Sequence, residues 1–347
     1  MNQNRLIHHE IGSEFWEVPT SKTGGVPLPE QTKWFISGTA ALTYIISDLL
    51  AAGPLNRAAL PSWCCSCMIH PFLRAGVEVL FYSVYVNSSG RLAVDYSSVP
   101  ECDATLVLPY FGYSDYDVIG TPTGKTIVDL THGIFSKTTP VGDYTFGSLR
   151  KWAGFYTGGF ALKNGDWQTT APILPADEGY LGLRKRAMDE KLQYLTGRRD
   201  DKAYLDLFEQ GEDFLDTCSC MGSCEQDAAL IQRLDVDFIR SRRRENASVL
   251  LAALSEYALF PKLSEDDCPL FVPLILPEEE RSALRRYLIS QEIYCPIHWP
   301  VSDLHRLTAQ QLSIYQNEIS LVCDQRYTVR DMERIIHAVK TFKTMDR

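Results

Sequence analysis

The sequence predicts an α/β protein with a large, mostly parallel sheet and a smaller C-terminal α+β domain. In the first half of the chain, short segments rich in β-branched or aromatic residues alternate with helical patterns, as in βαβ units. The stretch from Gly179 to Leu259 is charged and has a helical periodicity. A second, smaller alternation of strand and helix follows Pro261. A length of 347 residues fits one large and one small domain.

The elements of the large domain follow from local signals. Residues 1–30 are rich in polar residues, Gly and Pro, and we expect an irregular arm. Ser37 precedes an apolar-periodic run to Leu50, which predicts a helix that ends near Gly53. We expect strands and one intervening helix at the following positions: strands Ala58–Leu60, Val77–Tyr82, Thr105–Pro109, Thr126–Asp129, Thr145–Leu149 and Gly159–Leu162, and a helix over Met68–Ala75.

The remaining elements complete a chain of three parts, an arm over 1–30, a large domain over 31–259 and a small domain over 260–347. Asp235 to Leu254 reads as one long amphipathic helix, and we interpret its basic run, Arg240 to Arg244, as a solvated face. For the small domain we expect strands Phe271–Leu276 and Ile319–Val322 and helices Glu278–Ser290 and Val329–Phe342.

Composition excludes some classes of function. The formal net charge of −10 argues against a nucleic-acid-binding protein, which needs basic residues to neutralise phosphates. No apolar run approaches the roughly 20 residues that span a bilayer, and residues 1–14 lack the apolar core of a secretory leader. We therefore expect a cytoplasmic protein whose ten cysteines are mostly free thiols.

The first candidate motif is Ser148-Leu149-Arg150-Lys151, just after an expected strand. Enzymes that use pyridoxal phosphate (PLP) need one lysine that forms an imine with the cofactor aldehyde, and groups that hold the phosphate. Ser148 could hold the phosphate while Lys151 reaches the aldehyde carbon. Taken alone, Lys151 is more simply an exposed lysine. The Ser-x-x-Lys of penicillin-binding proteins is not favoured, because their Ser-Asp-Asn and Lys-Thr-Gly motifs are absent.

A strand-end carboxylate is the second candidate. Asp129 ends an apolar strand, and ligands of parallel sheets bind at the carboxyl ends of strands. An aspartate there can pair with the pyridinium nitrogen of PLP. His132 follows three residues later and could contact the phenolic oxygen of the cofactor. The simpler alternatives are a capping aspartate and a structural histidine.

Two further motifs fit the same cofactor. Gly38, Thr39 and Ala40 follow Ser37 at a helix start, where free N–H groups and the helix dipole bind anions. Trp63 follows a short strand and could stack on the pyridine ring. A plain N-cap and a core tryptophan are the ordinary uses of these residues. The joint occurrence of all four motifs, in this chain order, predicts PLP.

The sequence also resembles the DegT/DnrJ/EryC1/StrS sugar aminotransferases, from about Ser37 to about Val339. The similar segments are Ser37–Leu42, Leu60–Trp63 through Phe72, Gly76–Val79, Asp95, Val128–Gly133, Ser148–Lys151 with Gly158-Gly159, Ala228–Leu234, Arg243-Arg244, His298–Pro300 and Ile319–Leu321. This resemblance implies PLP-dependent transferase fold type I and an aminotransferase that acts through a Lys151 internal aldimine. It implies a sugar or nucleotide-sugar keto substrate and a homodimer paired through the helices that carry Ala228, Ala229, Ile231 and Leu234.

The predicted roles follow from the resemblance and the motifs together. Lys151, Asp129 and His132 are the expected catalytic residues, and Gly38, Thr39, Ala40, Trp63 and Ser148 are expected to bind the cofactor with them. Tyr110, His298 and Arg326 are candidate substrate contacts. The partners are then an amino donor and a keto acceptor, with no nucleic acid and no membrane.

One segment departs from the family pattern. The family usually has an Asn before the interface helix that reaches the phosphate of the partner subunit, whereas this chain has Cys218, Ser219 and Cys220 there, then Cys224. Ser219 is the candidate substitute. We expect no metal site, because three cysteines with this spacing lack a fourth ligand, and the same holds for Cys64, Cys65 and Cys67.

Other functions remain open at this point. The same cofactor serves lyases, dehydratases and desulfurases, and a desulfurase would need a mobile cysteine, for which Cys218–Cys224 is the candidate stretch. A non-catalytic member of the fold is a further alternative, although the presence of both Lys151 and Asp129 argues against it.

Overall fold

The computed structural model of the chain describes residues 7–218 and 220–345. Its helices are α1 Gly38–Ala52, α2 Ser66–Arg74, α3 Glu178–Leu195, α4 Tyr204–Thr217, α5 Glu225–Ile231, α6 Val236–Leu254, α7 Glu278–Ser290, α8 Ala309–Asn317 and α9 Val329–Met345. Its strands are β1 Ile11–Gly12, β2 Lys33–Phe35, β3 Arg57–Pro61, β4 Glu78–Val86, β5 Leu92–Asp95, β6 Ala104–Val107, β7 Asp117–Ile119, β8 Lys125–Asp129, β9 Tyr144–Ser148, β10 Gly159–Lys163, β11 Val272–Ile275, β12 Ile293–Tyr294 and β13 Glu318–Leu321.

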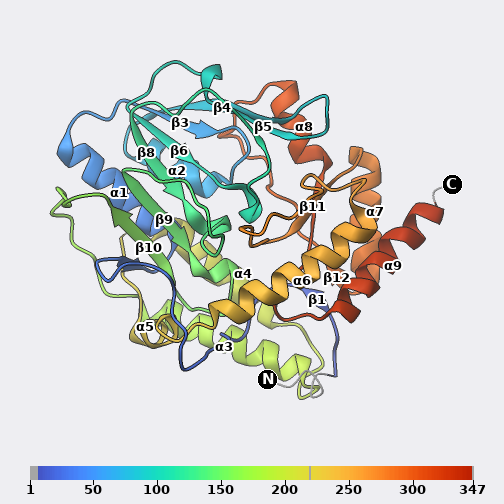
Figure 1. Cartoon of the computed structure of the whole chain (residues 1–347). Coiled ribbons are helices and arrows are strands. Elements are labelled where there is room, and N and C mark those ends of the chain that lie inside the picture. The colour runs from blue at the N-terminus through green and yellow to red at the C-terminus, as the bar shows by residue number, and fades with distance from the viewer. Residues whose placement is uncertain (1–6, 219, 346–347) are drawn as a thin grey trace.

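A nine-stranded sheet organises the first half of the chain (Figure 1). Its strand order is β2-β10-β9-β8-β6-β3-β4-β5-β7. The central strands β9, β8, β6, β3 and β4 are mutually parallel, whereas β10 and β2 on one side and β5 on the other join antiparallel. The expected large, mostly parallel sheet is therefore confirmed, and every strand expected within it is present.

Helix α1 begins and ends where its sequence signals indicate. The Ser37 side chain accepts a hydrogen bond from the Ala40 N–H at 3.1 Å, which is an N-cap, and Gly53 follows the last turn. Ala41, Leu42 and other apolar side chains of the helix are buried against the sheet. The expected helix start at Ser37 is confirmed.

The stretch from Gly179 to Leu259 is helical, as expected, but the interpretation of its basic run is wrong in part. Arg243 of α6 is almost fully buried. Its guanidinium donates to the Gln325 side chain and to the Leu270 carbonyl, and lies 4.4 Å from the Trp152 ring centroid. A buried arginine needs such partners. Arg243 therefore joins α6 to the small domain and to Trp152, so this part of the basic run does not face solvent.

The C-terminal part is a small α+β unit built on β11 and β13, which pair antiparallel. Helix α7 packs beside β13, and α9 packs against α7 and α6. The N-terminal arm returns to this unit, because β1 pairs in parallel with β12. In Figure 1, the arm passes close to the end of α6 and reaches β12 between the two parts of the molecule. The arm is thus mostly irregular but is held to the rest of the protein.

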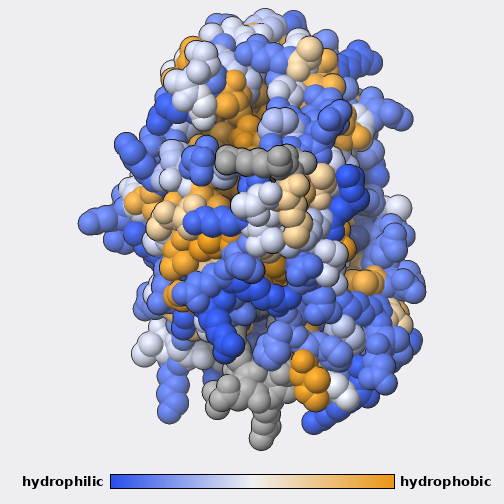
Figure 2. Space-filling model, turned by 90° about the vertical axis from the view of Figure 1, so that its right-hand side faces the viewer, coloured by the Kyte–Doolittle hydropathy of each residue, from blue (hydrophilic) through white to orange (hydrophobic). Residues whose placement is uncertain are grey.

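The surface that carries α7 and α9 is mostly hydrophilic, with hydrophobic residues in separate patches (Figure 2). Within residues 7–218 and 220–345, no helix combines the length and the apolar character needed to cross a membrane. Eight of the ten cysteines are free thiols, and Cys65 and Cys67 form a disulfide at the start of α2.

Candidate active site

Four of the predicted site residues lie at one edge of the large sheet. Because β3, β6, β8 and β9 are parallel, their carboxyl ends meet at the same edge. Asp129 and Ser148 are the last residues of β8 and β9, and Trp63 and Tyr110 follow β3 and β6. This edge is where open α/β sheets bind their ligands.

The N-terminus of α1 lies directly against the end of β9. A Cβ atom on Gly38 would lie 3.5 Å from both the Gly147 oxygen and the Ser148 Cβ. Gly159 allows this approach, since a Cβ there would come within 2.1 Å of the Ser37 oxygen. Gly38 and Ser148 are both half-buried and accessible. The helix start and the Ser148 turn therefore form one cradle with the positive end of a helix dipole, which suits a phosphate.

Asp129 is a buried carboxyl group, only 2% exposed. Its Oδ1 accepts a hydrogen bond from the Thr131 N–H at 2.8 Å. Burial raises the pKa of Asp129 from 3.8 to about 6, and the Thr131 hydrogen bonds oppose that rise. Among the described residues, no ion pair to Asp129 is formed. A buried carboxylate without a cation is a fitting partner for a cationic nitrogen of a ligand.

The lysine turn is tied to the Asp129 turn. The Trp152 indole N–H donates to the Thr131 carbonyl at 2.7 Å, and Gly147 lies so close to the Thr131 nitrogen that a Cβ would be 3.0 Å from it. These contacts hold Lys151, which is the last residue of a 3₁₀ turn after β9, beside the end of β8. Trp152 therefore fixes the position of Lys151 relative to Asp129.

Lys151 and His132 both line a cavity of about 620 Å³. Lys151 is exposed, whereas His132 is buried and its Nδ1 accepts from the Phe111 N–H at 3.4 Å. Burial lowers the pKa of His132 well below 6.5, and the nearby His298 and Lys151 lower it further. His132 is therefore neutral near pH 7, and it lies close enough to Lys151 for the two side chains to interact electrostatically.

The cavity is formed by parts of the chain that are far apart in sequence. The arm contributes Glu10 and residues 12–15, the lysine turn contributes Arg150, α4 contributes Glu212, and the small domain contributes the segments around His298 and Arg326. Its charged side chains are six basic residues, Arg150, Lys151, Lys202, Arg243, Arg285 and Arg326, and four acidic residues, Glu10, Glu14, Glu212 and Asp324. The basic excess favours an anionic ligand.

Trp63 is placed at the expected edge but does not line this cavity. It is fully buried, with the Tyr110 ring stacked on it at 4.9 Å and the Trp299 ring 5.7 Å away. Its indole N–H donates to the His298 carbonyl at 2.5 Å. Trp63 therefore has no exposed ring face in this structure, and one of its faces is covered by Tyr110.

The three candidate substrate contacts lie in different places. Tyr110 is fully buried, its hydroxyl donates to the Trp63 carbonyl at 2.8 Å, and it does not line the cavity. His298 and Arg326 do line it. The structure therefore brings two of the three to the cavity and places Tyr110 beneath Trp63.

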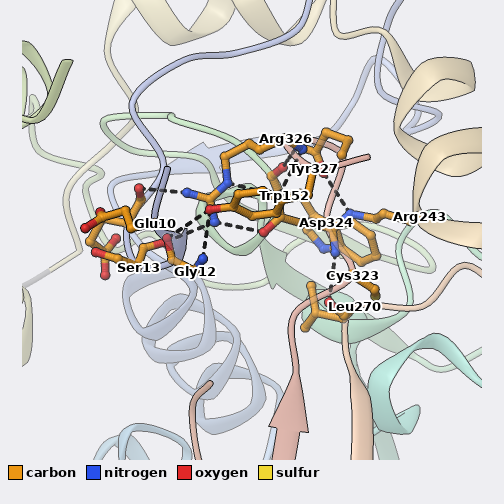
Figure 3. Close-up of polar contacts among 12 residues, drawn as sticks. Glu10, Gly12, Ser13, Trp152, Arg243, Leu270, Cys323, Asp324, Arg326 and Tyr327 are labelled. Carbon is orange, nitrogen blue, oxygen red and sulfur yellow. Dashed lines mark hydrogen bonds and ion pairs between the residues drawn. The ribbon is translucent and has the colours of Figure 1, made fainter. Parts of the chain in front are cut away.

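Arg326 connects the arm with the small domain (Figure 3). Its guanidinium pairs with Asp324 at 2.8 Å and donates to the Ser13 and Glu14 carbonyls at 3.1 and 2.9 Å. The pKa of Asp324 is lowered, because the Arg326 charge and hydrogen bonds outweigh its burial. This network holds the arm as one wall of the cavity.

Sequence reasoning missed the contribution of the arm and of Lys202. Glu10 is buried, and its carboxylate pairs with Lys202 at 2.7 Å and with Lys191 at 3.6 Å. Burial lowers the pKa of Lys191 to about 7, with Arg326 adding to the effect. The arm resembles a polar linker, and its only signal was the unusual density of His, Glu and aromatic residues from His8 to Trp16.

The cysteine-rich segment does not contribute to the cavity among the described residues. Cys218, Cys220 and Cys224 are at least partly buried, and the Cys220 thiol contacts the Ala40 carbonyl at 3.7 Å. None of these three cysteines lines the cavity, whereas Cys295 does line it and is only 3% exposed. In residues 7–218 and 220–345, no group of His, Cys, Asp or Glu side chains is arranged to hold a metal ion. Ser219, the candidate substitute for the family Asn, lies outside the described residues.

Comparison with known proteins rests on structure alone. No family model matches the sequence, and no curated protein matches it. Solved structures do match. Spr1654 from Streptococcus pneumoniae in its PLP form, assigned as a sugar aminotransferase, superposes with a TM-score of 0.60 at 14% identity over 97% of this chain and 98% of that one.

Two further structures give the same result. The sugar aminotransferase CalS13 from Micromonospora echinospora matches with a TM-score of 0.60 at 15% identity, covering 95% of this chain and 99% of that one. DesI, solved in the presence of its TDP-sugar product, matches with a TM-score of 0.59 at 14% identity, covering 89% and 80%. The chain therefore has the fold of these aminotransferases, and the predicted fold class, PLP-dependent transferase fold type I, is confirmed.

Proposed function

We propose that this protein is a PLP-dependent aminotransferase in which Lys151 binds the cofactor covalently. The observation that carries the proposal is the convergence of three features at one sheet edge. These are a phosphate cradle formed by α1 and Ser148, a buried Asp129 without a cation, and Lys151 beside a 620 Å³ cavity. The fold is shared with structures solved in PLP-bound form.

The residues present fit the cofactor. The cradle of Gly38, Thr39, Ala40 and Ser148 would hold its phosphate, and Asp129 would pair with its ring nitrogen. When bound, PLP supplies an aldehyde that joins amines and a ring that withdraws electrons from the amine-bearing carbon. Asp129 would keep that ring nitrogen protonated, because an ionised carboxylate at a buried site gains strongly from a nearby cation.

The side chains of the cavity would perform the proton transfers. The Lys151 Nζ takes the proton from the amine-bearing carbon of the donor and returns a proton in the second half of the reaction. His132, neutral because of its lowered pKa, can hydrogen-bond the phenolic oxygen without adding a positive charge next to Lys151. Trp63 would stack on the ring of the cofactor once the aromatic side chains packed around it move.

The substrate class follows from the cavity. Its six basic side chains against four acidic ones favour anionic ligands, such as the carboxylate of an amino donor and the phosphates of a nucleotide sugar. The likeness to DesI, which was solved with a TDP-sugar product, supports a keto sugar carried on a nucleotide as acceptor. His298 and Arg326 are the proposed contacts of the chain with these ligands.

Absorbance spectroscopy tests the proposal directly. The purified protein mixed with PLP should show a visible band that disappears on borohydride reduction, and peptide mass spectrometry should then locate the added mass on Lys151. Lys202→Met is the matched control, because Lys202 is another lysine of the same cavity. Labelling of Lys202 instead of Lys151, or no band at all, would reject the assignment.

We also propose a homodimer paired through the helices of the middle segment. Ala228 and Ala229 are exposed on α5, although the same stretch buries Ile231 and Leu234. Pairing of two copies would cover this apolar surface and exclude water from the cofactor. Light scattering should give a mass near twice 39.2 kDa. A mass equal to that of one chain would contradict a site shared between subunits.

We propose a cytoplasmic location because most of the cysteines are free thiols. Eight of the ten cysteines are free, which is usual for proteins of reducing compartments. Acid quenching of cells, followed by alkylation under denaturing conditions and mass spectrometry, should find these eight thiols unpaired.

A further inference from the structure

A chain of hydrogen bonds runs from a buried carboxylate to the wall of the cavity. Glu318, the first residue of β13, is fully buried. The Ser320 hydroxyl donates to its Oε1 at 2.5 Å, and the Ser320 oxygen lies 3.0 Å from the Nδ1 of His298. The other carboxylate oxygen of Glu318 accepts from the His298 backbone N–H at 2.6 Å. His298 itself lines the cavity with Lys151 and His132.

The direction of these hydrogen bonds follows from simple donor counting. An ionised carboxylate can only accept, and a hydroxyl has a single hydrogen. Ser320 uses that hydrogen on Glu318, so its oxygen can only accept from the ring of His298. The Nδ1 of His298 must therefore carry a proton, which leaves Nε2 as its only nitrogen available to a ligand.

We infer that Glu318 and Ser320 are positioning residues that lock His298 in the Nδ1-protonated form, so that Nε2 accepts a hydrogen bond from a hydroxyl or amine of the substrate. The location supports this role. The His298 ring is 6.1 Å from the His132 ring between centroids, and His132 in turn lies near Lys151. The lock depends on this chain alone, whereas the substrate role of Nε2 rests on the proposed function.

The protein contains an internal reference with the opposite arrangement. The Nε2 of His305 lies 3.1 Å from the Cys64 carbonyl, which can only accept, so that nitrogen carries the proton. The Nδ1 of His305 accepts from the Ser302 N–H at 3.2 Å. Two histidines of one small domain are thus assigned to opposite tautomers, and both can be examined in one spectrum.

Replacing Glu318 with glutamine should move the ring proton of His298 from Nδ1 to Nε2. The amide oxygen of the new side chain would accept from the His298 backbone N–H, which turns its NH₂ group toward Ser320. Ser320 would then accept from the amide and donate its own hydrogen to His298 Nδ1. Because the shape of the side chain is retained, E318Q keeps the fold and changes only the direction of donation. Ser320→Ala breaks the chain of hydrogen bonds at its centre, and Ser320→Thr retains the hydroxyl.

Nitrogen-15 NMR of histidine-labelled protein reads the tautomers without cofactor or substrate. The chain has seven histidines, and His298→Gln identifies the signals of His298. In its neutral form, wild-type His298 should show a protonated Nδ1, and His305 a protonated Nε2. E318Q should move the His298 proton to Nε2 and leave His305 unchanged, and Ser320→Thr should resemble wild type. A protonated Nε2 in neutral wild-type His298, or an E318Q spectrum identical to wild type, would overturn the lock.

The substrate role is read separately from kinetics. E318Q should retain the visible band of bound PLP and lose about tenfold in kcat/KM for the acceptor, the effect of one lost neutral hydrogen bond. An unchanged kcat/KM in a variant whose tautomer has reversed would overturn the role of Nε2. If the wild-type protein binds no PLP, the proposed function fails while the NMR result still decides the lock.

Discussion

Lys151→Ala should leave the fold intact and abolish transamination. Lys151 is exposed at the end of a 3₁₀ turn, and truncation of an exposed side chain outside the core changes stability by only about 0.5 kcal/mol. The same change removes both the covalent link to the cofactor and the group that moves the proton. The loss of a positioned acid–base group alone costs about 10²–10⁴-fold in rate. Amino-transfer rate assays measure the loss of turnover, and circular dichroism of the variant measures whether the fold is retained.

The control for this prediction is the other cavity lysine. Lys202 is held by Glu10 at 2.7 Å and by the Tyr294 hydroxyl at 2.9 Å, so its amine is committed to structure. Lys202→Met should therefore keep the visible band and reduce stability, which is the reverse of the Lys151→Ala result. A Lys151→Ala protein that retained the band and the wild-type rate would show that another lysine binds the cofactor.

Much of this arrangement could be predicted because it depends on local signals and on one rule of sheet topology. Ser37 caps its helix through a hydrogen bond to a residue three positions away, so the start of α1 is visible in the sequence. Asp129 and Ser148 end parallel strands, and parallel strands present their carboxyl ends at one edge. Their convergence follows without any knowledge of side-chain packing.

Other parts of the site depend on contacts between distant residues that no local pattern records. His298 acquires its role from Glu318, and Arg326 reaches back to Ser13 and Glu14. Tyr110 follows a strand as a substrate contact would, yet the next residue, Phe111, has a φ of 53° and the chain turns Tyr110 beneath Trp63. Such outcomes are decided by tertiary packing, which a single sequence does not show.

Asp129→Asn should make the cofactor-free protein more stable and the enzyme much less active. The folded-state pKa of Asp129, about 6, lies above its ordinary value of 3.8 because of burial. A raised pKa means that stability is full below the unfolded value and is lost as the pH rises through about 6. The difference between 3.8 and about 6 corresponds to about 3 kcal/mol. Asparagine carries no charge, so the stability gained by Asp129→Asn should be full above about pH 6. This gain should shrink as the pH falls from about 6 to 3.8 and vanish in stronger acid.

Thermal or urea unfolding of the cofactor-free proteins across this pH range measures the effect, and Asp48→Asn is its control. Asp48 is also fully buried, but it pairs with Lys163 at 2.7 Å and its pKa is lowered. Removing that charge should destabilise the protein well above pH 6, the opposite sign to Asp129→Asn. If Asp129→Asn also destabilised the cofactor-free protein there, Asp129 would be a structural cap and not a carboxylate kept for a ligand.

With cofactor, the sign for Asp129→Asn should reverse. The carboxylate then faces a cationic ring nitrogen, and a charge-assisted hydrogen bond of this kind contributes about 1.5–3 kcal/mol. Its loss should raise the dissociation constant of PLP by about 10- to 100-fold, and turnover should fall further because the neutral ring withdraws electrons less strongly. The Asp129 carboxylate would then lower the stability of the cofactor-free protein and raise the affinity for the cofactor, which is the behaviour expected of a ligand-binding residue. Measuring both unfolding and PLP binding in this one variant therefore distinguishes an active aminotransferase site from that of a non-catalytic member of the same fold.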